Sequence, residues 1–123
     1  MILLDTNALI WLLTGSGRAR PLEGQTASLR ISPISLLEIR FLQEVGRLTV
    51  GSGYGLEEIE VDSRWRLDSP SSRLLFAAAF DLDWTRDPFD RLLVAHARYR
   101  GWRLATGDRS LISRLGPTEV LEL

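Results

Sequence analysis

The chain has 123 residues, of which 45% are hydrophobic and 25% are charged, a composition typical of one globular domain with its own core. It carries 15 basic and 16 acidic residues, for a formal net charge of −1, and every basic residue is arginine. With no cysteine, no lysine and one histidine, the chain cannot form disulfides, thiolate or multi-histidine metal sites, or a Walker-type phosphate loop. Any enzymatic chemistry is therefore expected to use carboxylates, hydroxyls and amides, most naturally with a hard divalent cation.

The sequence also gives expectations about the cellular location of the protein and its number of domains. No apolar run reaches the length of about 18 residues that a membrane span needs. The N-terminus lacks the basic start and the cleavage site of a signal peptide. We therefore expect a cytoplasmic protein with no membrane contact, folded as a single domain over residues 1–123.

In the first half of the chain, short apolar runs alternate with helical patterns. The expected elements are a buried strand at 2–4, a helix at 8–13, a loop or weak helix at 14–24, a strand at 29–31, and a helix that opens at Ser32-Pro33 and runs to about Val45. Gly46 ends this helix, and Ile34, Leu37 and Phe41 are expected to form its apolar stripe.

The second half continues the alternation. A glycine-rich turn at 51–55 lacks the flanking strand and long helix of a dinucleotide-binding fingerprint. The elements expected after it are a strand within 61–67, a helix opened by Ser69-Pro70 and apolar through Phe80, a helix from Asp87-Pro88 to a Gly101 C-cap, a strand at 102–106, a short helix at 108–115 and a strand at 119–123. This order predicts an α/β fold with a parallel sheet between two layers of helices.

Four acidic residues fall where these strands end. Asp5 and Asp108 follow strands, Glu38 lies in the second turn of the helix that follows the second strand, and Asp90 lies in the first turn of the helix opened by Asp87. Because ligand sites in parallel sheets lie beyond the carboxyl ends of the strands, we expect the four side chains to converge there. So many like charges are costly together unless a cation neutralises them, and the group therefore indicates a divalent metal site.

Each acid also has a structural interpretation. Asp5 and Asp108 could each cap the helix that follows, and Asp90 stands at the third helical position after Asp87, where a capping box would place it. Glu38 is harder to explain by capping, because it lies beside the apolar stripe of its helix and so needs a partner.

Four segments resemble, in order, the motifs of PIN-domain ribonucleases, and in particular the VapC-type toxins of bacterial type II toxin–antitoxin modules. These segments are Leu4-Asp5-Thr6-Asn7-Ala8-Leu9, Ile34-Ser35-Leu36-Leu37-Glu38-Ile39, Asp87-Pro88-Phe89-Asp90-Arg91-Leu92-Leu93 and Ala105-Thr106-Gly107-Asp108. The resemblance covers nearly the whole chain.

The resemblance implies a three-layer α/β/α fold around a five-stranded parallel sheet, and an endoribonuclease that inhibits translation. It assigns Asp5, Glu38, Asp90 and Asp108 as the catalytic acids, which would hold one or two Mg²⁺ or Mn²⁺ ions. It also places Thr106 and Asn7 beside the site. The implied partners are an RNA substrate, such as a transfer RNA or a ribosomal RNA loop, a small VapB-type antitoxin, and a second copy of the chain in a homodimer. The segments 18–29 and 51–62 are shorter than in many relatives, which leaves the partner surfaces open.

The mechanism expected from these residue types is attack by a metal-bound water on an RNA phosphodiester. Glu38 could be a metal ligand or could orient that water as a base. Arg86, Arg91 and Arg109 flank the acids and are candidate phosphate contacts, or else surface charges paired with nearby acids. His96 lies in mid-helix with no Gly-x-Ser-x-Gly elbow in the chain, and we expect it to be packed and not catalytic.

Two other functions stay open. The chain could be a non-catalytic PIN-like module that binds RNA or protein, although four retained acids disfavour this. It could also be a structure-specific nuclease that acts on DNA with the same metal chemistry. Cleavage assays on RNA and DNA would separate the three.

Overall fold

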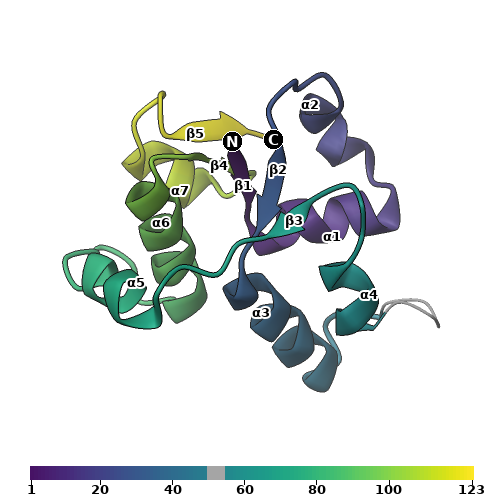
Figure 1. Cartoon of the computed structure of the whole chain (residues 1–123), viewed down its shortest axis with the longest axis horizontal. Coiled ribbons are helices and arrows are strands. Elements are labelled where there is room, and N and C mark those ends of the chain that lie inside the picture. The colour runs from purple at the N-terminus through teal and green to yellow at the C-terminus, as the bar shows by residue number, and fades with distance from the viewer. Residues whose placement is uncertain (50–54) are drawn as a thin grey trace.

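The computed structural model describes residues 1–49 and 55–123, so the glycine-rich turn expected at 51–55 lies outside the described residues except for Gly55. A five-stranded parallel sheet with the order β3-β2-β1-β4-β5 forms the middle layer (Figure 1). Its strands are β1 (Ile2–Leu4), β2 (Leu29–Ile31), β3 (Arg66–Leu67), β4 (Arg103–Thr106) and β5 (Val120–Glu122). The predicted strand positions and the parallel arrangement are confirmed.

Helices cover both faces of this sheet, as predicted (Figure 1). The helical elements are α1 (Thr6–Thr14), the 3₁₀ turn η1 (Gly17–Ala19), α2 (Arg20–Glu23), α3 (Pro33–Glu44), α4 (Leu56–Glu60), α5 (Ser72–Ala79), α6 (Pro88–Arg100) and α7 (Arg109–Arg114). None of the helices within residues 1–49 and 55–123 combines the length and the apolar character that crossing a membrane requires.

The central strand β1 divides the core in two because successive side chains of a strand point to opposite faces. Ile2 and Leu4 pack in one cluster with residues of α1, α3 and α4. Leu3 packs on the other face with residues of α5, α6 and α7. All three side chains are at most 1% exposed. A strand buried on both faces explains the uninterrupted apolar run in the sequence.

The helix starts are fixed by local chemistry that the sequence shows. The Ser32 and Asp87 side chains accept hydrogen bonds from the first turns of α3 and α6, and a proline stands at the start of each helix. Gly101 ends α6 in the left-handed conformation, with φ 69°, which glycine adopts at little cost. Because of these caps, α3 begins directly after β2, and α6 begins directly after the loop that follows α5.

Two expectations differ from the structure. Leu37 and Phe41 are 63% and 45% exposed, so they do not form a buried stripe of α3; the buried side chains of this helix are those of Ser35 and Ile39. Sequence periodicity gives the angle between residues on a helix, but it does not show which side faces the sheet. Helix α5 begins at Ser72 and not directly after Ser69-Pro70.

A buried hydrogen-bond network around His96 ties α6 to α3. The His96 side chain is fully buried, with Nδ1 2.9 Å from Ser32 Oγ and Nε2 2.7 Å from Asp68 Oδ2. Since a carboxylate only accepts, Nε2–H donates to Asp68, and Nδ1 accepts from the Ser32 hydroxyl. Arg100 donates to both oxygens of Asp68. Burial lowers the pKa of His96, so the imidazole stays neutral, as this pattern requires. His96 is therefore structural, in agreement with the sequence interpretation.

Replacing His96 by leucine should cost about 2–4 kcal/mol of unfolding free energy, because Ser32 and Asp68 then lose a buried partner. Urea denaturation followed by circular dichroism measures the change. Tyr99→Leu is the matched control, since Tyr99 is on the same helix and 42% exposed, and should change stability by about 0.5 kcal/mol or less. Equal losses in the two variants would contradict a special role for the network.

Candidate active site

The carboxyl edge of the sheet brings the four predicted acids into one electrostatic neighbourhood. Asp5 directly follows β1, and its backbone N–H donates to the Ala105 carbonyl of β4 over 3.0 Å. Asp108 follows β4, while Glu38 and Asp90 extend from α3 and α6, which pack against each other. Burial, and in addition repulsion from neighbouring carboxylates, raises the pKa values of Asp5, Glu38 and Asp90.

Asp5 is the most buried of the acids, at 5% exposure. Its Oδ1 accepts from the Ala8 N–H over 2.7 Å, which caps α1, and the Thr106 side chain also hydrogen-bonds to the carboxylate. Burial nevertheless raises the pKa of Asp5 to about 6, because these hydrogen bonds only partly compensate for the lost hydration. Asp5 thus caps α1, as its structural interpretation proposed, and its ionised form is also destabilised by burial.

Glu38 has the partner that its apolar position demanded. The Thr6 hydroxyl donates to Glu38 Oε1 over 2.5 Å, and the Thr6 and Ser35 hydroxyl oxygens are 3.2 Å apart. A hydroxyl has one proton, so Ser35 donates to Thr6 while Thr6 donates to Glu38. Burial is the main cause that raises the pKa of Glu38. Two hydroxyls in series therefore fix one carboxylate oxygen.

Asp90 is the acid with the least compensation. Among the described residues no donor hydrogen-bonds to its carboxylate, and a capping box with Asp87 does not form. Burial, followed by repulsion from the other acids, raises the pKa of Asp90 to about 7. The ionised form of this carboxyl group is thus disfavoured in the absence of a cation.

Asp108 caps α7 with one oxygen only. Its Oδ1 accepts from the Ser110 N–H, the Ser110 hydroxyl and the Leu111 N–H over 2.8, 2.7 and 3.3 Å. The Asp108 N–H donates to Thr106 Oγ1 over 3.1 Å, so the Thr106 side chain links Asp108 to Asp5. Thr106 therefore lies beside the acids, where the sequence placed it.

Asn7, the other residue expected beside the site, takes part through its main chain. Its backbone N–H lowers the pKa of Asp5, and its side chain is exposed at the start of α1. Asn7 thus supports the Asp5 carboxylate together with Ala8.

A fifth carboxylate, that of Asp87, lies in the same electrostatic neighbourhood as the four predicted acids. Its Oδ1 caps α6 by accepting from the Phe89 and Asp90 N–H groups over 2.9 and 3.2 Å. Its charge also raises the pKa values of Glu38 and Asp90. Sequence reasoning treated Asp87 only as a cap, and the Asp-Pro-Phe-Asp spacing, which puts two acids in one helical turn, was the signal for its second effect.

The donor set fits a hard divalent cation in its chemistry. Within residues 1–49 and 55–123, no three histidine or acidic side chains are close enough to surround one ion, so the acids share a neighbourhood without forming a closed ligand shell. Carboxylate oxygens are the ligands that Mg²⁺ and Mn²⁺ prefer. A cation beside Asp5 and Asp90 would also offset the burial and repulsion that raise both pKa values.

The three candidate arginines have different environments. Arg91 donates to the Ala79 and Phe80 carbonyls at the end of α5, both over 2.8 Å, which makes it a structural link between α5 and α6. Arg109 forms an ion pair with Glu122. Arg86 is exposed and makes no hydrogen bond or ion pair with the part of the chain that the structure describes. Arg86 is thus the most available of the three to an external anion.

Sequence reasoning missed a second arginine near the acids. The Arg18 guanidinium stacks on the Trp11 ring, 4.0 Å from its centre. Both side chains pack on Gly107, where an added Cβ would lie 2.8 Å from Trp11 and 3.1 Å from Arg18. Only glycine leaves room for this stack next to Asp108. No local pattern in the expected loop at 14–24 marked Arg18, because the contact joins segments far apart in the sequence.

Asp5→Asn should stabilise the metal-free protein at neutral pH. The pKa of Asp5 is about 6 in the folded chain against an ordinary value of 3.8, so between these two pH values the folded chain keeps a proton that the unfolded chain has released. Ionisation of Asp5 therefore lowers stability as the pH rises from about 4 to about 6. Asparagine keeps the helix cap without the charge, and the gain should reach about 2 kcal/mol above this window and vanish below it.

Urea denaturation in EDTA at both ends of the pH window measures this gain. Asp83→Asn, at an exposed acid, is the control and should show no such pH dependence. Mg²⁺ should stabilise the wild type more than Asp5→Asn. If Asp5→Asn is less stable than the wild type at neutral pH without metal, the electrostatic argument is wrong.

Three comparisons with known proteins, by family model, by sequence and by structure, agree with one another. The sequence matches the family model of the PIN domain over residues 2–116. It is 30% identical to Ribonuclease VapC22 of Mycobacterium tuberculosis over 97% of this chain and 95% of that protein. Two solved structures share the fold: a toxin–antitoxin complex from Klebsiella pneumoniae, with a TM-score of 0.69 and 20% identity over all of both chains, and DNA-bound VapBC from Salmonella typhimurium, with a TM-score of 0.64 and 19% identity over 98% of this chain and 96% of that one. The chain belongs to the PIN-domain family, and its resemblance to VapC-type members is confirmed.

Proposed function

We propose that the chain is a divalent-metal-dependent endoribonuclease and the toxin of a toxin–antitoxin pair. The observation that carries this proposal is the Asp90 carboxylate, which is partly buried, lacks a donor among the described residues and has a pKa raised to about 7. A buried acid with this environment is typical of a site that binds a cation or moves a proton. The ribonuclease activity named for its VapC-type relative gives the reaction class.

Each acid has a role in this proposal. Asp5 and Asp90 would hold Mg²⁺ or Mn²⁺ directly, and Asp108 would add Oδ2, since its Oδ1 is occupied by three donors. The bound ion would lower the pKa of a water and stabilise charge on the phosphodiester. Glu38 has Oε1 held by Thr6, which leaves Oε2 to orient the attacking water and accept its proton. Arg86 and Arg18 would contact RNA phosphates.

RNA cleavage should depend on both the metal and the acids. We expect the purified chain to cut RNA hairpins with Mg²⁺ or Mn²⁺, to be inactive in EDTA, and to lose at least about a hundredfold in rate in Asp5→Asn and Asp90→Asn. Asp83→Asn should cleave like the wild type, because Asp83 is exposed and outside the acidic group. A gel assay with matched DNA hairpins measures cleavage and substrate class. Cleavage in EDTA would remove the metal proposal, and absence of cleavage on all substrates would favour a binding module.

The surface beside the acids fits a protein partner with an apolar face and a basic side chain. The exposed Leu37 flanks Glu38 on α3, and Phe41 on the same helix contacts Phe89, next to Asp90, with ring centres 5.9 Å apart. The structural relatives are toxin–antitoxin complexes, and we therefore propose that a small VapB-type antitoxin covers this surface. A homodimer of the toxin is a further part of this proposal.

Expression of the chain alone should arrest bacterial growth, and the small protein encoded beside it should restore growth. The double variant Leu37→Ser/Phe41→Ser should still arrest growth but resist the rescue, because the apolar contacts are lost while the acids stay. Phe80→Ser, at a residue 72% exposed outside this surface, is the control and should be rescued. Growth curves and incorporation of labelled amino acids measure both effects. Rescue of the double variant would place the antitoxin elsewhere.

A further inference from the structure

A second polar site lies at the opposite edge of the sheet from the carboxylates. A pocket of about 300 Å³ opens where β2 and β3 begin, lined by residues 28–30 and 63–66. The acids of the candidate active site follow the carboxyl ends of the strands, whereas this pocket is at the amino ends. The pocket therefore does not belong to the active site described above.

The lining is strongly basic. Three of its side chains are arginines, Arg30, Arg64 and Arg66, and two are serines, while none is acidic. Arg30 and Arg66 are directly paired in the parallel register of β2 and β3, so their side chains leave the same face of the sheet. Like charges directly opposite each other on neighbouring strands destabilise a sheet. An anion between or beside the two guanidinium groups would relieve the repulsion of this pairing.

Arg30 has a donor that the protein does not use. Its Nε is buried and lacks a hydrogen-bond partner within the described residues. A buried N–H without a partner costs free energy, and a charged donor costs more than a neutral one. The Arg30 guanidinium lies 5.9 Å from the Trp102 ring, which partly compensates for its charge but offers no acceptor.

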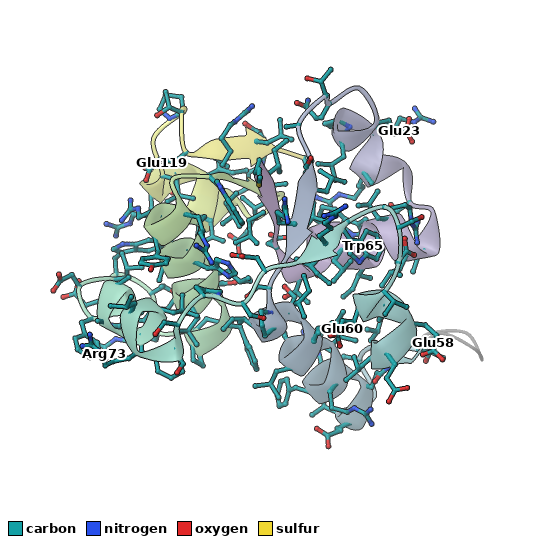
Figure 2. All side chains as sticks on the ribbon, viewed as in Figure 1. Glu23, Glu58, Glu60, Trp65, Arg73 and Glu119 are labelled. Atoms are coloured by element: carbon teal, nitrogen blue, oxygen red, sulfur yellow. The ribbon has the colours of Figure 1, made fainter. Side chains whose placement is uncertain are left out.

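The other wall of the pocket is fixed in place. Arg64 donates to both oxygens of Asp62 and to the Leu12 carbonyl, and its guanidinium stacks on Trp65. Trp65, labelled in Figure 2, donates its indole N–H to the Ile59 carbonyl over 2.7 Å. Arg64 thus forms a rigid wall, and Arg30 and Arg66 are the groups that would meet a ligand.

We propose that this pocket binds a phosphate group. Arginine presents parallel N–H donors that match two phosphate oxygens, and the hydroxyls of Ser28 and Ser63 add neutral donors at the rim. The group can be a free phosphate or a phosphate of an RNA strand. The site does not depend on the proposed cleavage, since it shares no residue with the acids.

The test uses the full chain carrying Asp5→Asn, in EDTA, so that RNA stays intact. Inorganic phosphate, adenosine 5′-monophosphate and a short single-stranded RNA are titrated separately, with chloride at equal ionic strength as the blank. The readouts are the NMR shifts of the Arg30 Nε–H and the Trp65 indole N–H, which report on the pocket itself. Phosphate should shift both signals, and Arg66→Gln and Arg30→Gln should each weaken binding about tenfold.

Arg73→Gln is the matched control, because Arg73 is an exposed arginine on α5, well away from Trp65 (Figure 2). It should change the affinity by less than about twofold. Thermal melts show whether each variant is folded, and phosphate should raise the melting temperature of the Arg73→Gln protein but not of the Arg66→Gln protein. Tighter binding of the RNA than of the two small probes identifies a strand as the ligand, and equal binding identifies a free phosphate. Equal shifts in chloride, or equal losses in Arg73→Gln and Arg66→Gln, would overturn the proposal. Absence of RNA cleavage by the wild-type chain with divalent metal, together with intact phosphate binding in this test, would reject only the proposed function.

Discussion

Burial of carboxylates at one sheet edge, together with their mutual repulsion, is the constraint that the rest of the structure must support. Asp5 and Asp90 have pKa values of about 6 and 7, well above the usual range, so the ionised site costs folding free energy at neutral pH. The fold compensates by holding most of these groups with donors that cannot move away: backbone N–H groups at three helix starts, and the hydroxyls of Thr6 and Thr106. The burial of β1 on both faces contributes apolar free energy that offsets this cost.

The relative placement of α3 and α6 connects the core to the site. Ser32 and His96, joined by a buried hydrogen bond, each lie six residues from a site acid on their own helix, Glu38 and Asp90 respectively. A shift of either helix would therefore break this hydrogen bond and move an acid at the same time. The Asp-His-Ser arrangement has the members of a hydrolytic triad, but its serine and histidine are fully buried. The network therefore cannot contact a substrate. Its role is to hold α3 and α6, and with them Glu38 and Asp90, in their relative positions.

Local chemistry in the sequence predicted most of the fold and the acids, and long-range packing decided the rest. Strand β1 and the caps at Ser32, Asp87 and Gly101 could be predicted because each depends on neighbouring residues only. The buried face of α3 could not be predicted in this way, because Ser35 faces the core, where it hydrogen-bonds to Thr6, while Leu37 faces solvent. Arg18 near Asp108 and the Arg30–Arg66 pair were equally hidden, because the first depends on the path of a loop and the second on the register between β2 and β3.

The net charge of −1 conceals two regions of opposite charge at the two ends of the strands. Acids gather at the carboxyl ends of the strands, and an arginine pocket without acids lies at the amino ends. A polyanion approaching the cation-free protein would be attracted to the pocket and repelled from the acids, because both fields act over about 10 Å at moderate ionic strength. If a divalent cation binds at the acids, it reverses the sign of that edge as well as activating water. The proposed cation would then affect where a nucleic acid strand binds as well as whether the strand is cut, and metal dependence should already be visible in RNA binding by a variant that cannot cleave but keeps Asp5 and Asp90.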